Sequence, residues 1–579
     1  MNPQDFFSKK DYKFKLPPHL TDYQKTYDDF NWQEAAKEEI SYFDGGKLNA
    51  AYNAVDRHLQ TDRKNKKALL WEGDKGEKET YTFEELSKWS NKYGNYLKSL
   101  GVEKGDRVFL FLPRIPAVYF SFLGILKIGA IAGTLFSAFQ EKALLDRLEN
   151  SGAKVVITTK ELLPRLVPLR KDLPELKTVV VVDDPQFLEQ IKPVSDQLSV
   201  MPMEPTDYAF MLYTSGTTGK PKGIVHTHNA ILSQHLTAKY ILDIHNEDIY
   251  WCTADHGWVT GIAYGILGSL SCGVTSVVYS GRFDAAKWYE ILQNYKVTIW
   301  YTAPTAIRML MAGGDELVAK YDLSNLRHLL SVGEPLNPEA IRWGLKVYGL
   351  PFHDTWWQTE TGSIIIGNYP TMDIKIGVMG KPFMGIHTGI VDDKGVEVPN
   401  KTEGNIAMKP GWPSQMAWVW NNDEKYKSYF ENGWYISGDR GWKDDEGYFH
   451  FVGRADDVIK TSGERVGPFE VESSLIEFPG VVEAGVIGKP DALRGEIIKA
   501  FVVLSPELRE KAKDEEFVKK LKDDLAMHVK KNLAGHAYPR EVDFIDKLPK
   551  TRSGKIMRRI LKAQEMGEPV GDTSTLEEY

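Results

Sequence analysis

Residues 213–223 read Tyr213-Thr214-Ser215-Gly216-Thr217-Thr218-Gly219-Lys220-Pro221-Lys222-Gly223. Glycines let backbone N–H groups approach an anion closely, hydroxyls donate to phosphate oxygens, and lysines balance the charge. An apolar run over 208–212 precedes the segment and a helical pattern over about 229–241 follows it. We therefore predict a phosphate-binding loop between a strand and a helix. A flexible Ser/Gly linker is the alternative, but linkers rarely end in Lys-Pro-Lys-Gly.

The loop is not of the Walker A type. That pattern needs four residues between its glycines and a Ser or Thr after the lysine. Here only Thr217 and Thr218 separate Gly216 from Gly219, and Pro221 follows Lys220.

The composition describes an ordinary globular protein. The 579 residues are 42% hydrophobic and 26% charged, with a net charge of −8, which gives no indication of binding to nucleic acid or anionic membranes. The two cysteines, Cys252 and Cys272, exclude a disulfide framework and a cysteine-rich zinc site. Without a cationic, apolar N-terminal signal, the expected location is cytoplasmic.

The longest apolar stretch, from Ala117 to Phe139, could be a membrane span by length. It contains Lys127 and three glycines, and Arg114 precedes it. A buried helix followed by a buried strand is the better interpretation, so we expect no membrane association.

Strands alternate with helices through residues 82–301, which favours parallel, doubly wound sheets. Short runs separated by turns indicate a β-rich subdomain over about 377–453. A smaller unit with a long charged helix over 507–531 follows. We predict an α/β fold: a large N-terminal domain (1–455) of two doubly wound α/β subdomains plus the β-rich subdomain, and a small, mobile α+β C-terminal domain (456–579). Residues 1 to about 70 could wrap the body of the protein.

Four further motifs carry chemistry. The segment Asp354-Thr355-Trp356-Trp357-Gln358-Thr359-Glu360-Thr361-Gly362 offers tryptophans that could floor a pocket, a hydroxyl for a phosphate and a carboxylate for Mg²⁺. Asp439, after a tight turn, could accept from the vicinal hydroxyls of a ribose. Ser331-Val332-Gly333-Glu334-Pro335 could lie flat against a base. Around Lys555, five cations within ten residues could form an anion-binding tail or a solvated basic face.

At these residues, from about 46 to 560, the chain resembles the adenylate-forming enzymes, which include acyl-CoA synthetases, luciferases and peptide-synthetase adenylation domains. Within them it is most similar to the AMP-forming acetyl-CoA synthetases (acetate–CoA ligases). The resemblance implies that acetate attacks the α-phosphate of Mg-ATP to give acetyl-AMP and pyrophosphate. The small domain then rotates, and the thiol of CoA attacks the acyl carbonyl. ATP and CoA are thus substrates, and Mg²⁺ accompanies ATP.

The resemblance also implies residue roles. Lys555 is the catalytic lysine, Glu360 faces the metal, and Asp456 is the hinge between domains. Lys555 is also a candidate for reversible acetylation by a lysine acetyltransferase and deacetylase. The predicted acyl pocket consists of Trp258, Val259, Thr260, Val332 and Trp357. The predicted ATP/AMP contacts are Thr214, Ser215, Gly216, Thr217, Thr218, Gly219, Lys220, Gly333, Glu334, Pro335, Asp354, Thr355, Trp356, Gln358, Thr359, Asp439, Arg454 and Arg465.

Several alternatives stay open at the level of sequence. The acid could be propionate or another short- or medium-chain acid, although Trp357 argues against bulky ones. A non-catalytic nucleotide sensor is a second alternative, and luciferase-type chemistry is not excluded by motif. Arg454 could make a surface ion pair. His256 stands where the family usually has Pro or an apolar residue, and a lone histidine is more often structural than catalytic. The oligomeric state is not indicated.

Overall fold

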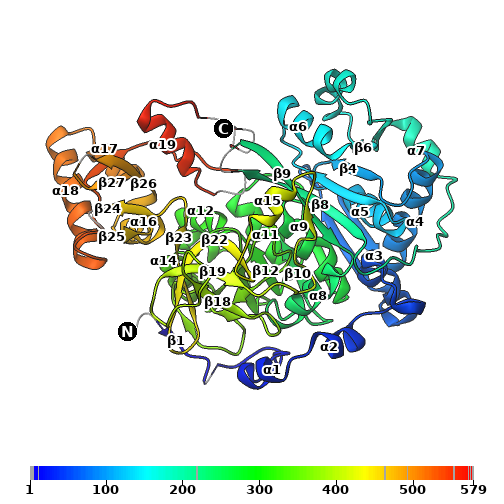
Figure 1. Cartoon of the computed structure of the whole chain (residues 1–579), viewed down its shortest axis with the longest axis horizontal. Helices are drawn as coiled ribbons and strands as arrows, with labels where there is room; N and C mark the ends of the chain where they lie inside the picture. The colour runs from blue at the N-terminus through cyan, green and yellow to red at the C-terminus, as the bar shows by residue number, and fades with distance from the viewer. Residues whose placement is uncertain are drawn as a thin grey trace.

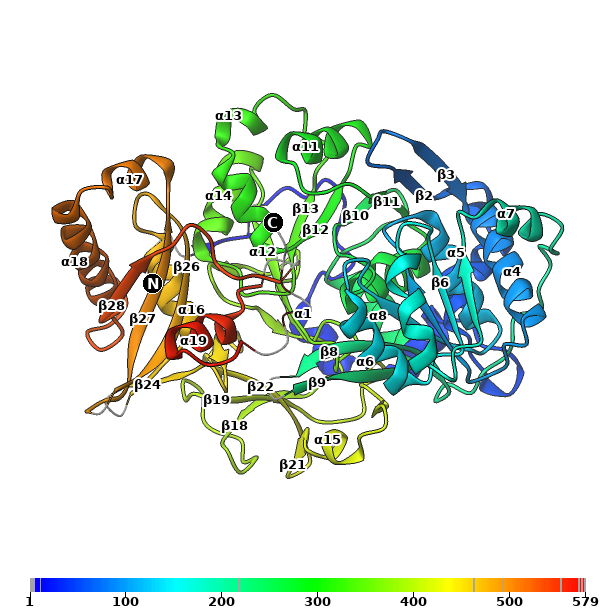
Figure 2. The same cartoon turned by 90° about the horizontal axis from the view of Figure 1, so that it is seen from above.

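The computed structural model describes residues 6–10, 12–216, 219–461, 464–491, 493–551, 555–570, 573 and 576. Two large sheets lie side by side, a twisted antiparallel sheet lies along one edge, and a C-terminal unit stands at one end (Figures 1 and 2). The predicted fold class is confirmed: parallel sheets flanked by helices form the bulk of the chain, followed by a β-rich layer and a small mixed unit.

The first sheet is parallel over its centre and runs in the order β17-β15-β14-β13-β12-β10-β11-β2-β3. The strands from β2 to β14 are hydrophobic over most of their length because helices cover the sheet. Its members are β2 (Lys67–Glu72), β3 (Lys78–Thr82), β10 (Ile249–Cys252), β11 (Thr275–Tyr279), β12 (Ile299–Thr302), β13 (His328–Ser331), β14 (Phe352–Trp356), β15 (Ile366–Gly367) and β17 (Lys381–Pro382).

The second sheet runs β20-β9-β8-β5-β4-β6-β7, with parallel pairing from β8 to β7. It shares one hydrophobic core with the first sheet: Val108, Leu69 and Tyr250 belong to a single buried cluster. Its members are β4 (Arg107–Phe111), β5 (Ile131–Leu135), β6 (Val155–Thr158), β7 (Thr178–Val181), β8 (Tyr208–Gly216), β9 (Gly219–Thr227) and β20 (Trp418–Val419).

Helices cover both sheets. A capping box starts α4: the Thr82 hydroxyl accepts from the N–H of Glu85, and the Glu85 carboxylate accepts from the N–H of Thr82. The helices are α3 (Ala50–Ala54), α4 (Phe83–Ser99), α5 (Pro116–Lys127), α6 (Glu141–Ser151), α7 (Pro185–Ile191), α8 (Ala230–Tyr240), α9 (Val259–Ile262), α10 (Gly268–Ser271), α11 (Ala285–Asn294), α12 (Pro304–Ala312), α13 (Asp315–Val318) and α14 (Pro338–Tyr348).

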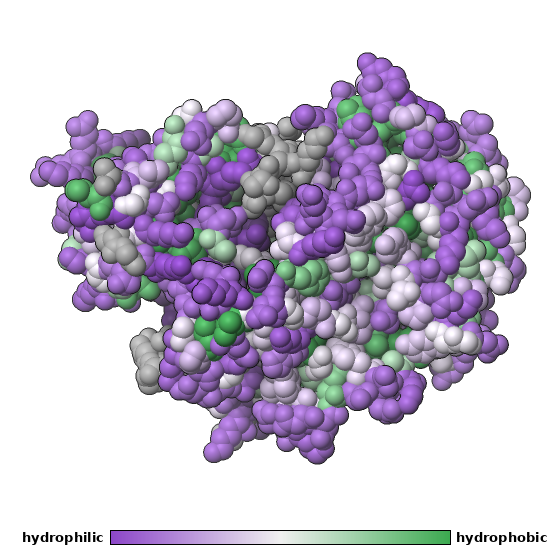
Figure 3. Space-filling model, viewed as in Figure 1, coloured by the Kyte–Doolittle hydropathy of each residue, from purple (hydrophilic) through white to green (hydrophobic). Residues whose placement is uncertain are grey.

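The long apolar stretch divides as predicted into the buried helix α5 and the buried strand β5. Lys127, at the end of α5, is fully buried, and its ammonium lies 2.8 Å from both Asp56 and the Asn91 amide oxygen. Among the described residues, no helix is long and apolar enough to cross a membrane. The visible face in Figure 3 is mostly hydrophilic, with hydrophobic residues scattered over it.

The β-rich layer is an antiparallel sheet in the order β18-β19-β22-β21, with β23 paired to β22. It comprises β18 (Thr388–Val391), β19 (Gly404–Met408), β21 (Phe430–Glu431), β22 (Trp434–Lys443) and β23 (Phe449–Arg454), with α15 (Asp423–Lys427) beside it. The C-terminal unit comprises β24 (Ile459–Thr461), β25 (Glu464–Val466), β26 (Val481–Asp491), β27 (Gly495–Leu504), β28 (Glu541–Phe544), α16 (Pro468–Ile476), α17 (Pro506–Lys511), α18 (Glu515–Asn532) and α19 (Arg558–Met566).

Two local expectations were wrong. The segment 213–223 joins two antiparallel strands, because residues 219–227 continue as β9 before α8 begins. The charged helix over 507–531 is two helices, because the Asp514 carboxylate accepts from the N–H groups of Glu516 and Phe517 and starts α18 anew.

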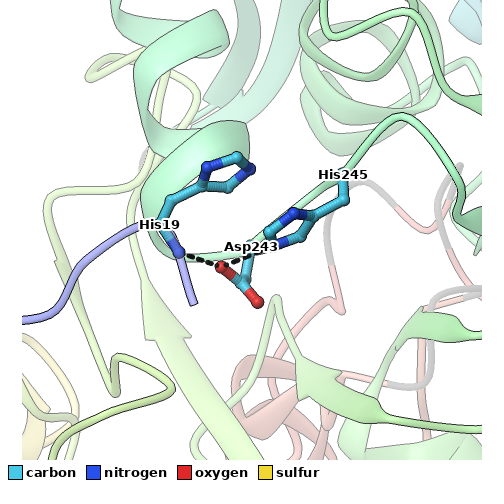
Figure 4. A group of neighbouring side chains, drawn as sticks. All are labelled: His19, Asp243 and His245. Atoms are coloured by element: carbon cyan, nitrogen blue, oxygen red, sulfur yellow. Dashed lines mark hydrogen bonds and ion pairs between the residues drawn. The ribbon is translucent and has the colours of Figure 1, made fainter. Parts of the chain in front are cut away.

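The N-terminal segment runs along the outside of the molecule, as the blue chain with α1 (Tyr23–Asp29) and α2 (Trp32–Glu39) in Figure 1 shows. Its first strand, β1 (Phe6–Phe7), pairs with β16 (Ile374–Lys375). His19 anchors the segment (Figure 4): its ring stacks on His245 at 3.9 Å, and its backbone N–H donates to Asp243. Arg327 lies 2.8 Å from the same carboxylate and 2.5 Å from Asp248, so the segment is anchored at a buried group of ion pairs.

Candidate active site

The candidate site lies where strands of the first sheet end beside the β-rich layer. Gly333–Pro335 follow β13, residues 357–362 follow β14, and Asp439 pairs with Arg454 across β22 and β23. Crevices at the carboxyl ends of parallel strands are the usual ligand sites of open α/β sheets. The motifs that the sequence singled out therefore meet in space, although up to 120 residues separate them in the chain.

Asp439 lies at the centre of the site. Its buried carboxylate accepts from the Trp356 indole N–H and the Gln358 amide, both at 3.0 Å, and lies 3.4 Å from Arg454. Burial raises the pKa of Asp439, while the positive charges of Arg454 and Lys555 oppose that rise. Arg454 therefore does not form a plain surface ion pair, because its partner is this buried carboxylate.

Lys555 comes from the far end of the chain to the same cluster. Its side chain reaches solvent, but the protein packed around it and the charge of Arg454 lower its pKa, while Asp439 opposes the change. The hydroxyl of Thr551 accepts from its backbone N–H at 3.1 Å. The basic segment thus places Lys555 against the site. Residues 552–554 lie outside the described part of the chain.

The phosphate loop is described in part. Thr217 and Thr218 lie outside the described residues, and only the backbone is described for Ser215, Gly216, Gly219 and Lys220. Thr214, at the start of the loop, has a buried hydroxyl without a hydrogen-bond partner among the described residues. A buried, unpaired hydroxyl at this position is suited to a ligand oxygen.

Glu360 belongs to a chain of polar contacts that sequence reasoning missed. Tyr429 donates to its carboxylate at 2.8 Å, and the ammonium of Lys222 lies 3.1 Å from the Tyr429 hydroxyl. No described residue donates to the second carboxylate oxygen. That free oxygen fits the single-carboxylate ligation that Mg²⁺ uses beside substrate phosphates. The Lys-Pro-Lys pattern could have indicated Lys222, but no sequence signal indicated Tyr429.

In the segment after β13, the Glu334 side chain is already occupied by partners within the protein. Gly333 has φ 94°, and the Glu334 carboxylate is held by the Thr305 hydroxyl and by Arg308 at 2.9 Å. Pro335 follows. Asp354 and Thr355 likewise have inward partners: Ser331 donates to Asp354 at 2.7 Å, and burial raises the pKa of that carboxyl to about 7. Gln358 and Thr359 follow the two tryptophans, and the Thr359 carbonyl lies 2.8 Å from His226.

The predicted acyl-pocket residues lie on neighbouring elements. Val259 and Thr260 begin α9, Trp258 immediately precedes it, and Val332 follows β13. The Trp258 ring packs against Phe136 at 4.6 Å. Trp357 is half-buried and contacts Tyr264 and Tyr301, two residues that the sequence did not single out.

His256 is structural in this arrangement. The Tyr119 hydroxyl donates to the Gly265 carbonyl at 3.2 Å, so the ring nitrogen Nε2 of His256 is the donor to Tyr119 at 3.3 Å. Burial lowers the pKa of His256 to about 3, which keeps the ring neutral. It therefore supports, through Tyr119, the turn that follows α9.

Two predicted residues lie at or beyond the edge of the cluster. Arg465 is exposed on β25, and no hydrogen bond or ion pair within the described chain joins it to Asp439 or Lys555. Asp456 is exposed in the turn between β23 and β24, 3.6 Å from Arg454. Its position on the connection between two sheets is compatible with a hinge, and the hinge stays a prediction.

Comparisons with known proteins identify the family. Residues 55–413 match the family of AMP-binding enzymes, and residues 470–555 match the C-terminal domain of AMP-binding enzymes. An acetyl-coenzyme A synthetase of Bacillus subtilis is 56% identical, over 97% of this chain and 98% of its own length. One from Methanothrix thermoacetophila is 42% identical, over 92% of this chain and 86% of its own length.

Solved structures are similar over nearly the whole chain. A Brucella canis acyl-CoA synthetase superposes with a TM-score of 0.73 at 34% identity, covering 95% of this chain and 99% of that one. An anthranilate CoA ligase in complex with anthranoyl-AMP gives a TM-score of 0.82 at 32% identity, covering 90% and 98%. This chain therefore belongs to the family of AMP-binding enzymes.

Proposed function

We propose that this enzyme is an AMP-forming acetate–CoA ligase. In the first step a carboxylate oxygen of acetate bonds to the α-phosphorus of ATP and the bond to pyrophosphate breaks, giving acetyl-AMP. In the second step the CoA sulfur bonds to the acetyl carbon and AMP leaves. The convergence of Lys555, from the C-terminal unit, with Asp439 and Arg454, from the β-rich layer, carries this proposal.

Each residue has a task set by its surroundings. Asp439, fixed by Trp356 and Gln358, accepts from the ribose hydroxyls. The ammonium of Lys555 offsets the repulsion between acetate and triphosphate and stabilises charge on the α-phosphate in the transition state. The segment 214–220 cradles the phosphates. Magnesium bound to the ATP phosphates supplies additional positive charge, and Glu360 presents a free oxygen to it. Asp456 serves as the hinge between residues 1–455 and 456–579.

The identity of the relatives and the half-buried Trp357 support acetate over longer acids. We place the enzyme in the cytoplasm. The accessible Lys555 is the target of a lysine acetyltransferase and deacetylase, because acetylation removes the charge that adenylation needs. Acetylated enzyme should lose adenylation yet still convert added acetyl-AMP and CoA to acetyl-CoA.

The test is acid-dependent exchange of labelled pyrophosphate into ATP without CoA. We expect strong exchange with acetate and little with butyrate or benzoate. Lys555→Ala should reduce exchange by about 100-fold or more, the size typical of losing a transition-state charge contact. The matched control is Lys562→Ala, a lysine on α19 paired with Glu496. Best exchange with a longer acid would overturn the acetate assignment. Absent exchange despite ATP binding would favour a nucleotide sensor.

A further inference from the structure

The indole of Trp357 is held by two buried tyrosines from separate elements. Tyr301 comes from the end of β12, and Tyr264 comes from the π-helical turn Ala263–Leu267 that follows α9. Both tyrosines are completely buried, whereas Trp357 is only partly so. Two buried residues, which are not exposed to the substrate, therefore determine the position of the Trp357 ring.

Hydrogen bonds fix the Tyr301 hydroxyl in one orientation. The Thr355 hydroxyl donates to the Ser331 carbonyl at 2.7 Å, so it must accept the proton of Tyr301, also at 2.7 Å. The Tyr301 oxygen is then free to accept from the Trp357 indole N–H at 3.3 Å. The relay runs in one direction and ends on a backbone carbonyl, so the indole nitrogen has a defined acceptor.

Tyr264 is fixed in the same manner. The Thr237 hydroxyl donates to the Ser233 carbonyl at 2.6 Å and so accepts from Tyr264 at 2.7 Å. The Tyr264 oxygen accepts from the backbone N–H of Ile364 at 2.7 Å. The ring thus anchored stands at 88° to Trp357, with centroids 5.1 Å apart. Edge-to-face packing from this side blocks movement of the indole away from the substrate.

Two further residues, Tyr119 and His256, stabilise the turn that carries Tyr264. Tyr119 donates to Gly265 within the π-helical turn, and His256 donates to Tyr119. π-Helical turns often occur at functional sites, because the extra residue re-aims a side chain. Here the re-aimed side chain is the tyrosine that packs on Trp357.

We propose that Tyr264 and Tyr301 are specificity-determining residues that lock Trp357 in place and so limit the acid to a short chain. The inference rests on the proposed adenylation of acetate and assigns the length limit to the buried pair as well as to the indole. Without the Tyr301 hydroxyl the indole N–H loses its acceptor, and without the Tyr264 hydroxyl the ring packed on the indole loses both of its hydrogen bonds. In either variant the indole is held less firmly and can move enough to admit an added methylene. The residues act through Trp357 and are positioning residues that touch no substrate.

The experiment compares wild type, Tyr264→Phe, Tyr301→Phe and the control Tyr289→Phe in the full-length enzyme. Tyr289 is also a completely buried tyrosine bonded to another hydroxyl, that of Tyr348 at 3.3 Å, but it packs in a separate core cluster. The measured quantity is the ratio of kcat/KM for propionate to kcat/KM for acetate in pyrophosphate exchange. Thermal unfolding of each variant is measured in parallel.

We expect each site variant to raise the ratio about 3- to 10-fold, the range that corresponds to losing one hydrogen bond. Trp357→Gly should raise it further. Tyr289→Phe should lower the unfolding temperature without changing the ratio. Unchanged ratios in both folded site variants, or an equal rise in the control, would overturn the proposal while leaving acetate adenylation intact. If wild type fails to activate acetate, the proposed function falls and this inference with it.

Discussion

Protonation of a single residue, Asp354, makes the stability of the protein depend on pH. Asp354 lies in the middle of β14 and is buried, and among the described residues only Ser331 donates to it from a side chain. Burial raises the pKa of its carboxyl from 3.8 to about 7. The folded protein therefore keeps a proton that the unfolded chain releases in mild acid, so the contribution of this carboxyl to stability is largest at low pH and falls between about pH 4 and pH 7. Its contribution to the free energy of unfolding falls by about 4 kcal/mol in total.

Asp354→Asn should remove this pH dependence because the amide cannot ionise. Between pH 5 and pH 8, we expect the unfolding temperature of wild type to fall by a few degrees more than that of the variant. Differential scanning calorimetry at both pH values measures this. Asp523→Asn, on the exposed face of α18, is the control. Parallel curves for wild type and Asp354→Asn would contradict the assignment of a protonated Asp354.

Asp439 leads to a second prediction at this scale. Asp439→Asn keeps the shape of the side chain. It removes the negative charge that attracts Arg454 and strengthens the hydrogen bonds from the ribose hydroxyls. We expect the KM for ATP to rise about 10- to 100-fold, as for losing a charge-assisted hydrogen bond. The KM for acetate should change little. Equal changes in both constants would indicate a general collapse of the site.

At the scale of elements, α17 and α18 show what a single cap does. Their sequence has one continuous charged helical pattern, yet Asp514 divides it. Asp514→Ala should destabilise the first turn of α18 by about 1 kcal/mol. Hydrogen exchange should detect this as about fivefold faster exchange at Glu516 and Phe517. Asp523→Ala, in the middle of α18, should leave those amides unchanged.

The same comparison shows what the sequence can and cannot predict. The capping box at Thr82 and the division of residues 117–139 into α5 and β5 depend on residues that are close together in the chain. Patterns in the sequence therefore indicate them. The phosphate loop was misplaced between strand and helix because nothing local shows that residues 219–227 pair back onto β8 and onto β20. Tyr264, Tyr301 and Tyr429 were missed because their roles depend on partners far away in sequence.

At the scale of the whole molecule, a few contacts hold the C-terminal unit in the orientation that presents Lys555. The Asn337 amide donates to the Ser473 hydroxyl at 2.9 Å, and Arg342 lies 3.5 Å from Glu477. These bonds join the start and the first turns of α14 to α16. They belong to this orientation, so the proposed rotation of the unit about Asp456 would have to break them.

Ser473→Ala should therefore disfavour adenylation without harming thioester formation. We expect a two- to tenfold loss of pyrophosphate exchange, about the worth of one hydrogen bond. The rate of acetyl-CoA formation from added acetyl-AMP should stay constant or rise. Ser428→Ala, in the loop after α15, is the control. A parallel loss in both half-reactions would mean that this contact does not select an orientation.

The first sheet also has a consequence for how the protein is made. Strand β2 is bordered on one side by β3, but its other side pairs with β11, and the Thr275 hydroxyl donates to the Lys67 carbonyl 208 residues away. During translation, the edge of β2 that pairs with β11 has no hydrogen-bonding partner until β11 has been synthesised. Nascent chains that stop before β11 should thus aggregate or recruit chaperones, whereas chains released after the sheet closes should not.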